Sequence, residues 1–292
     1  MASLRDLRSR IKSVGNIKQI TRAMEMVATT KLRRFQDRAV ASRPYAQEIA
    51  QLLGRLSAAM GERLADQPVF RPGSGKAIAL LVIGSDRGLC GAYNSQLFNA
   101  FERFLAAHPG ADVRCFVYGK RVYQYLQKRG GVTIERYFAE PPLEKLDYRL
   151  AKFTAKTLVD AFTSGEYREV DILYTAFESM AKYVPTAMSF LPVQSAVSED
   201  KNSATIDPIV EPNVEALLQK LVPRYLETRI YNAMLEAITS EYASRRMAMK
   251  NATDAATDMQ GMLKGVYNRK RQEGITKELL DIVGGAEALR GK

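Results

Sequence analysis

Residues 224–260 read RYLETRIYNAMLEAITSEYASRRMAMKNATDAATDMQ, a stretch without proline or glycine. It consists mostly of the strong helix formers Ala, Met, Leu, Glu, Lys and Arg. Extended over residues 213–289, the pattern predicts a single helix about 115 Å long at 1.5 Å per residue. Because helices in compact domains average about 11–12 residues, we expect this helix to need a second long helix beside it.

Residues 3–60 supply that second helix. Their apolar residues recur at steps of three and four, which is typical of an amphipathic helix. The predicted stripe consists of Leu4, Leu7, Ile11, Val14, Ile17, Ile20, Met24, Val27, Leu32 and Phe35, then Ile49, Leu52, Leu53, Leu56 and Met60. The three-residue steps from Val14 to Ile17 to Ile20 would overwind a coiled coil locally. Pro44 should kink or briefly interrupt the helix.

The middle of the chain has a different periodicity. Residues 77–195 alternate expected strands (77–83, 113–118, 132–137, 170–177, 185–192) with expected helices (94–107, 120–128, 143–163), between turn-rich linkers at 61–76 and 196–212. Strands alternating with helices predict a Rossmann-like α/β domain with a mostly parallel sheet covered on both faces. We expect the helices of residues 1–60 and 213–292 to lie outside this inserted domain and to pair antiparallel as a coiled coil.

The Gly84–Gly91 turn lies where a doubly wound fold would bind a phosphate. It lacks the G-x-G-x-x-G spacing, and the chain has no P-loop motif, so a structural turn is favoured. We expect Asp86 and Arg87 to form a local salt bridge. Cys90 is expected to be a small buried residue, because no Cys–His pair is evident for nucleophilic chemistry.

The net charge of +11 is concentrated in residues 1–60, which hold twelve Lys and Arg against four acids. Such a stretch could meet nucleic acid, an anionic membrane surface or an acidic protein. Two alternatives stay open on residues alone: a nucleotide-binding enzyme, and a basic coiled-coil protein that binds nucleic acid. Cys90, Cys115 and His108 do not form a metal-ligand spacing, and no cofactor is expected. No secretory leader or spanning run is evident, which favours a reducing compartment.

Several stretches resemble the gamma subunit of F-type ATP synthases. Residues 11–27, IKSVGNIKQITRAMEMV, resemble its N-terminal helix, and residues 85–91, SDRGLCG, look like its central motif. Residues 238–253, ITSEYASRRMAMKNAT, are similar to its C-terminal signature, and residues 268–280 also match. The resemblance covers essentially the whole chain.

This resemblance implies a non-catalytic rotor in the central stalk. Such a subunit couples proton-driven rotation of the c-ring to conformational change in the alpha3beta3 hexamer. Its expected partners are the alpha, beta and epsilon subunits and the c-ring, with no nucleic acid and an indirect, peripheral membrane association. The start at Met1 without a transit peptide favours the cytoplasmic side of a bacterial inner membrane, with the matrix side of the mitochondrial inner membrane as the alternative. We expect the long helices to be stable only inside the complex.

The resemblance also assigns residues. Arg271, Gln272 and Thr276 match positions that grip the catch loop of beta. Met24 lies where the shaft passes the acidic loop of beta, with Lys31 and Arg34 as candidate partners. The signature positions are Arg245, whose partner is left unassigned, and Asp86, Arg87, Gly88 and Gly91. The chain lacks the cysteine-bearing insert of plastid members, so thiol regulation of that type is not expected.

Overall fold

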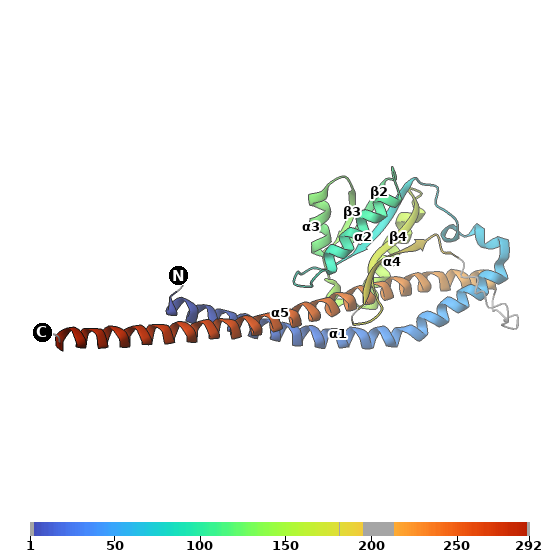
Figure 1. Cartoon of the computed structure of the whole chain (residues 1–292). Helices are drawn as coiled ribbons and strands as arrows, with labels where there is room; N and C mark the ends of the chain where they lie inside the picture. The colour runs from blue at the N-terminus through green and yellow to red at the C-terminus, as the bar shows by residue number, and fades with distance from the viewer. Residues whose placement is uncertain (1–2, 181, 195–212, 291–292) are drawn as a thin grey trace. The chain divides into compact units, whose positions relative to one another are not determined.

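The computed structural model describes residues 3–180, 182–194 and 213–290. The chain forms two compact units, one from residues 29–245 and the other from residues 1–28 and 246–292. Two long helices, α1 (Leu4–Met60) and α5 (Val214–Arg290), contribute to both units. Within each unit, segments of these two helices lie side by side and antiparallel (Figure 1). The predicted pairing of the long helices is therefore confirmed.

The first unit contains a five-stranded sheet in the order β3-β2-β1-β4-β5. The strands are β1 (Ala77–Ile83), β2 (Val113–Tyr118), β3 (Thr133–Phe138), β4 (Tyr167–Phe177) and β5 (Tyr183–Leu191). The pairings of β1 to β4 with one another are parallel, and β5 pairs antiparallel to β4. The sheet is accompanied by α2 (Tyr93–Ala107), α3 (Lys120–Arg129) and α4 (Tyr148–Thr163). The predicted Rossmann-like α/β domain is confirmed.

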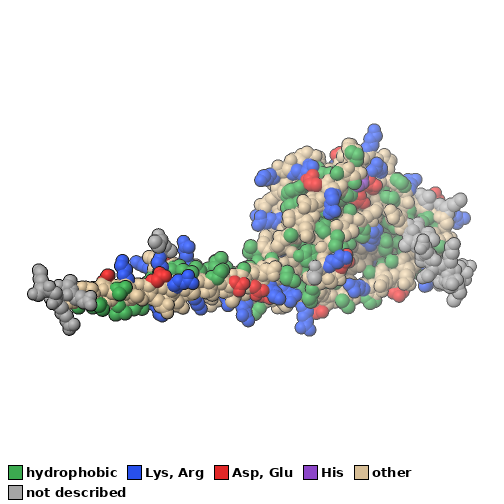
Figure 2. Space-filling model, in the orientation of Figure 1, with side chains coloured by type: hydrophobic (Ala, Val, Ile, Leu, Met, Phe, Trp, Pro, Cys, Tyr) green, Lys and Arg blue, Asp and Glu red, His purple; other side chains and the backbone are tan. Residues whose placement is uncertain are grey.

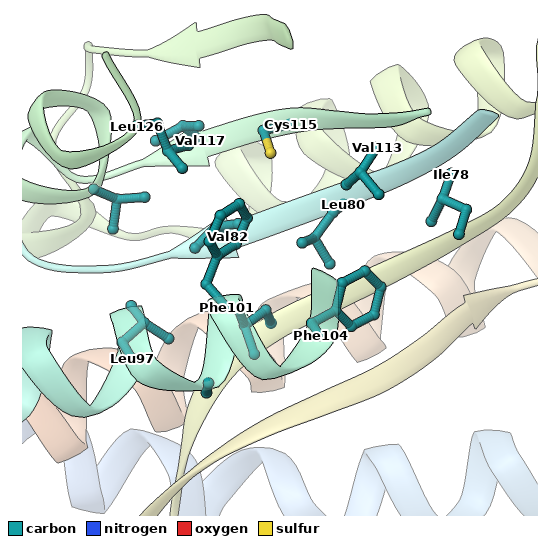
Figure 3. Packing of buried hydrophobic residues seen from close by; sticks show 13 residues of the cluster. Ile78, Leu80, Val82, Leu97, Phe101, Phe104, Val113, Cys115, Val117 and Leu126 are labelled. Atoms are coloured by element: carbon teal, nitrogen blue, oxygen red, sulfur yellow. The ribbon is translucent and has the colours of Figure 1, made fainter. Parts of the chain in front are cut away.

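All seven residues of β1 are buried, which explains why its sequence is a continuous apolar run rather than an alternating one. One face of the sheet packs against α2 and α3, where Leu80 and Val82 lie near Leu97 and Phe101 (Figure 3). On the opposite face, the hydroxyl of Tyr118 lies 2.7 Å from that of Thr154 in α4. The sheet is thus covered on both faces, as predicted.

The predicted start of one helix was wrong by five residues, and the other strand and helix bounds of the α/β domain lie within three residues of the prediction. The helix expected from residue 143 begins instead at Tyr148, after a short 3-10 turn at Leu143–Lys145. Asp147 caps it, since its Oδ1 accepts a hydrogen bond from the Leu150 amide at 2.8 Å. The linker at 61–76 contains two 3-10 helices, Gly61–Asp66 and Pro68–Phe70, whereas the linker at 196–212 lies outside the described residues.

The brief interruption of α1 expected as one effect of Pro44 does not occur, because the helix continues through it without a break, and the alternative kink stays a prediction. A proline removes one intrahelical hydrogen bond. Phe35 and Ile49, on either side of Pro44, are buried and hold the flanking turns.

The expectation that the C-terminal helix lies outside the α/β domain was wrong for its first part. Seven apolar residues of α5 are at most 1% exposed: Leu218, Leu226, Ile230, Met234, Leu235, Ala237 and Ile238. They belong to the same unit as the sheet. This part of α5 is packed in a hydrophobic core within the chain. The expectation that the long helices are stable only inside the complex therefore does not apply to it.

In the second unit, the seam between the helices differs from the predicted stripe. Ile17, Ile20 and Val27 are more than half exposed. Buried and half-buried positions that alternate steps of three and four instead run along both helices: 7, 11, 14, 18, 21, 25 and 28 in α1, and 246, 249, 253, 256, 260, 263, 267 and 270 in α5, with 15, 24, 248 and 252 half-buried beside them. This spacing is that of a heptad repeat, and because Ile17 and Ile20 are not part of it, their three-residue steps give no reason to expect overwinding.

Small residues set the close approach of the two helices. The hydroxyl of Thr253 donates to that of Thr21 at 2.8 Å, and both residues are buried. A Cβ at Gly15 would lie 3.0 Å from Nε2 of Gln260. The hydrogen bond satisfies polar atoms that would otherwise be costly in the seam. Thr21 therefore replaces Ile20 at the position that faces α5.

The pH dependence of folding provides a test of the sheet. Burial raises the pKa of Asp171 in β4 to about 6, from an ordinary value of 3.8. The folded state therefore favours the protonated carboxyl, and stability from this group is lost as the pH rises from about 4 to 6. After discounting for partial exposure, we expect Asp171→Asn to raise the free energy of unfolding at pH 7 by about 1 kcal/mol.

Chemical denaturation of both proteins across this pH range checks the prediction. The difference in free energy of unfolding between the Asn variant and the parent should increase as the pH rises. An equal pH dependence of the two would show that the Asp171 carboxyl has an ordinary pKa.

Candidate functional site

The Gly84–Gly91 loop joins β1 to α2 at the carboxyl edge of the sheet and is closed by its own side chains. A Cβ at Gly84 would lie 2.2 Å from Cγ2 of Val122, so glycine is required for this close approach. The buried hydroxyl of Ser85 donates to the carbonyl of Arg87 at 2.9 Å. Nδ2 of Asn94 donates to Sγ of Cys90 at 3.2 Å. Cys90 is buried, as predicted, and burial raises the pKa of its thiol.

Asp86 and Gly88 fix the loop against α3. Oδ1 of Asp86 accepts a hydrogen bond from the Lys120 amide at 3.0 Å, the first residue of that helix. A Cβ at Gly88 would lie 3.0 Å from Nη2 of Arg121. The predicted salt bridge between Asp86 and Arg87 is wrong, because no ion pair joins these two described residues. The carboxylate instead lies at the N-terminus of α3, a position that favours a negative charge.

Helix α5 crosses the carboxyl ends of β1 and β4. The hydroxyl of Ser240 donates to the carbonyl of Thr175 at 3.1 Å, and that of Ser244 donates to the carbonyl of Cys90 at 2.6 Å. The hydroxyl of Tyr93 donates to the Ala237 carbonyl at 3.2 Å. In doubly wound sheets this crevice is where ligands bind. Here it is filled by the chain's own helix, which argues against the nucleotide-enzyme alternative.

Arg245 connects α5 to the loop and provides the partner that the sequence left unassigned. Its Nη2 lies 2.6 Å from Oε1 of Glu241, and their side chains are only 9% and 10% exposed. The same nitrogen donates long hydrogen bonds of 3.4 Å to the carbonyls of Arg87 and Gly88. Burial raises the pKa of the Glu241 carboxyl, and the Arg245 guanidinium acts in the opposite direction. We call the Gly84–Gly91 loop together with Glu241, Ser244 and Arg245 the loop–helix junction.

Sequence reasoning did not single out several members of this region, namely Tyr93, Thr175, Ser240, Glu241 and Ser244. A signal was nonetheless present. Glu241 and Arg245 stand four residues apart in a predicted helix, the spacing of a favourable ion pair. Ser240 and Ser244 have the same spacing, so they share one face of α5.

The basic residues predicted to meet the acidic loop of beta have contacts of their own. Lys31 forms an ion pair with Glu144, and its Nζ lies 5.6 Å from the ring centroid of Tyr242. Burial lowers the pKa of its ammonium group. Arg34 is exposed, with its guanidinium carbon 5.9 Å from the centroid of the Phe35 ring. Of the two, Arg34 is therefore the better placed to meet a partner.

A cavity of about 450 Å³ adjoins the junction. Its lining includes the carboxylates of Asp86, Glu140, Glu144 and Glu241, although Lys120 and Arg87 also reach it. So many carboxylates disfavour a bound polyphosphate. Among the described residues, no group of three or more His, Cys, Asp or Glu side chains is arranged to hold a metal ion.

The predicted catch-loop residues lie in the second unit. Arg271, Gln272 and Thr276 are exposed on α5, and Met24 is half-buried in α1. Every residue from 275 to 286 is exposed, including the apolar Ile275, Leu279, Leu280, Ile282 and Val283. Figure 2 shows hydrophobic and basic side chains exposed along this two-helix part of the chain. Apolar exposure of this extent is typical of a surface that binds another protein.

These features define a class of protein: an antiparallel coiled coil that carries an α/β domain. In this class, one of the coiled-coil helices (here α5) fills the carboxyl edge of the sheet, where other α/β domains bind ligands. Residues 3–289 match the family model described as ATP synthase. The curated ATP synthase gamma chains of Geobacter sp. (strain M21) and Geotalea daltonii are 36% and 38% identical, each covering 100% of both chains. The chain therefore belongs to the ATP synthase gamma-chain family, which confirms the resemblance drawn from its motifs.

Solved structures share the fold. A chain from the central stalk and c-ring of Tetrahymena thermophila mitochondrial ATP synthase has a TM-score of 0.59 at 24% identity, covering 80% of this chain and 99% of that one. A chain from the Euglena gracilis mitochondrial ATP synthase, OSCP/F1/c-ring, has a TM-score of 0.66 at 18% identity, covering 98% and 94%.

Substitutions at Asp86 test how the loop is held. We expect Asp86→Ala to lower the free energy of unfolding by about 1 kcal/mol, because the first turn of α3 loses its capping acceptor. Asp86→Asn keeps a side-chain oxygen and should cost less. Denaturant unfolding, with hydrogen exchange at the Lys120 amide, measures both effects. If both variants keep the parent's free energy of unfolding and its exchange rate at the Lys120 amide, the capping role of Asp86 is ruled out.

Proposed function

We propose that this chain is the central-stalk rotor of a proton-transporting ATP synthase. As a member of the gamma-chain family, it is a subunit of the ATP synthase complex. It turns within the alpha3beta3 hexamer and couples rotation of the c-ring to conformational change at the catalytic sites. The observation that carries the proposal is the full-length match to ATP synthase gamma chains.

The chain contributes mechanics rather than catalysis to the complex. The filled crevice at the sheet edge supports this proposal, since α5 donates hydrogen bonds where a substrate or nucleotide would need them. The carboxylates around the adjoining cavity support it further. The α/β domain then serves as a foot that meets the epsilon subunit and the c-ring.

The coiled coil offers the surface for the alpha and beta subunits. A groove of about 840 Å³ in the second unit is lined by five basic side chains and no acidic ones: Arg5, Arg8, Lys12, Lys18 and Arg22. This charge is complementary to acidic loops on a surrounding ring. Exposed ion pairs contribute about 0–1 kcal/mol each. Many such weak contacts let a shaft turn, whereas one deep contact would trap it at a single angle.

The complex places this chain at a membrane without inserting it. None of the described helices has a stretch that is both long and apolar enough to span a bilayer. The bacterial origin of the gamma chains above supports the cytoplasmic face of a bacterial membrane as the site. Attachment there is through the c-ring.

Co-expression with bacterial alpha and beta subunits tests the rotor proposal. A pull-down on this chain should recover alpha and beta in roughly threefold excess, and a bead on the chain should rotate when ATP is added. We expect Arg271→Ala combined with Gln272→Ala to weaken ATP-driven rotation, because the exposed groups that would bond the catch loop are lost.

Lys277→Ala is the matched control, since Lys277 is exposed on the same stretch of α5 and is not assigned to the catch loop. It should rotate like the parent. Normal assembly and rotation of the double variant would remove the catch-loop assignment. Failure of the parent chain to recover alpha and beta would contradict the rotor function itself.

A further inference from the structure

We propose that Glu241 and Arg245 form a torque-bearing link between the α/β domain and α5. In this role Glu241 is a positioning residue, and Arg245 is the group that holds the Gly84–Gly91 loop. The inference rests on the proposed rotor function and specifies where in the chain the load passes. Force applied to the α/β domain reaches the shaft through this pair.

The geometry of Arg245 supports a role in holding rather than in filling space. Its guanidinium contacts a carboxylate on its own helix and two carbonyls of the loop. The planar guanidinium holds its donors in a fixed arrangement, and the charge strengthens the bond to Glu241. Because Glu241 stands one turn earlier on α5, it sets the direction in which the guanidinium points.

The neighbouring contacts differ in kind. Ser240 and Ser244 bond to carbonyls through neutral hydroxyls, whereas the bonds of Arg245 come from a charged donor. The side chains of Arg245 and Glu241 are only 9% and 10% exposed, so both charges lie in a nearly buried site. Moving the loop away from Arg245 would leave the guanidinium paired only with Glu241 on its own helix and would remove its bonds to the two loop carbonyls in a nearly buried site. Among the contacts described at the junction, the pair is the one that places a charged donor against the loop.

A second arginine anchors α5 farther along the same unit. Nη2 of Arg229 donates to the carbonyl of Ser189 in β5 at 2.7 Å. Arg229 and Arg245 are about 24 Å apart along the helix at 1.5 Å per residue. Two anchors at this separation, one on β5 and one on the loop after β1, oppose both tilting and twisting of α5 against the sheet.

Stability alone gives a weak reason for this pair. Replacing a buried ion pair with apolar residues of similar volume is often neutral or stabilising. Apolar residues would leave α5 freer to slip against the loop, because apolar contact is not directional. The directional contacts of Arg245 hold one register between helix and loop.

The experiment measures rotation under load in an assembled alpha3beta3 complex containing the full chain. Lys128→Cys on α3 provides an exposed thiol for a bead on the α/β domain, while both native cysteines are buried. Arg245→Met, Glu241→Gln and Arg245→Lys are compared with this parent. Glu102→Gln is the matched control, because its carboxylate pairs with Arg129 at the same 2.6 Å but outside the junction.

We expect all complexes to hydrolyse ATP and to rotate small beads alike. With large beads, Arg245→Met and Glu241→Gln should slip, so that rotation slows while hydrolysis continues. Arg245→Lys, which keeps the charge but loses the fork, should be intermediate. Glu102→Gln should match the parent.

Full torque in Arg245→Met would overturn the inference. Unfolding or loss of assembly in Arg245→Lys would also overturn it, because the pair would then be a folding determinant. A parent complex that assembles but never rotates the bead contradicts the rotor function instead. The two failures are therefore distinguishable.

Discussion

The structure of the first unit depends on how α5 satisfies the carboxyl edge of the sheet. At this edge the strand-end carbonyls and the N-termini of the following helices have unsatisfied polar groups. Ser240, Ser244 and Arg245 supply donors to the carbonyls, and Asp86 supplies an acceptor to α3. The apolar residues of α5 from 226 to 238 can be buried because these polar groups are matched.

The same edge explains how a fold that commonly binds nucleotides can serve a mechanical subunit. Folds of this kind support many functions, and the function is decided by what occupies the site. Here α5 occupies the site. Because α5 is part of the same chain, it stays bound at the carboxyl edge of the sheet permanently. Tyr242 extends this arrangement to α1, since its ring stacks on Phe35 with centroids 5.8 Å apart and lies under Lys31.

Periodicity predicted the elements well because buried strands and amphipathic helices have strong local signals. The bounds of β1 and β2 agree with the prediction at both ends. The α1 stripe failed between Ile17 and Val27 because exposed apolar residues look like core residues in a sequence. The true seam uses Thr21, whose polarity hides it from a pattern based on apolar residues.

The site was predicted in part. The motif around Asp86 was recognised, but its contacts were not, because Lys120 and Arg245 are brought to the loop by tertiary packing. The great length of the predicted C-terminal helix suggested that it packs outside the α/β domain. Its first third proved to be core, since length says nothing about which turns of a helix face a sheet.

Native-state hydrogen exchange of the isolated full chain tests the central claim, that α5 is seated in the edge of the sheet. β1 is fully buried, and most of residues 226–245 of α5 are buried as well. The account predicts that both groups exchange slowly and with similar protection, while residues 275–286 exchange fast. If residues 226–245 exchange as fast as residues 275–286 while β1 stays protected, α5 is not seated in the sheet edge and the account is wrong.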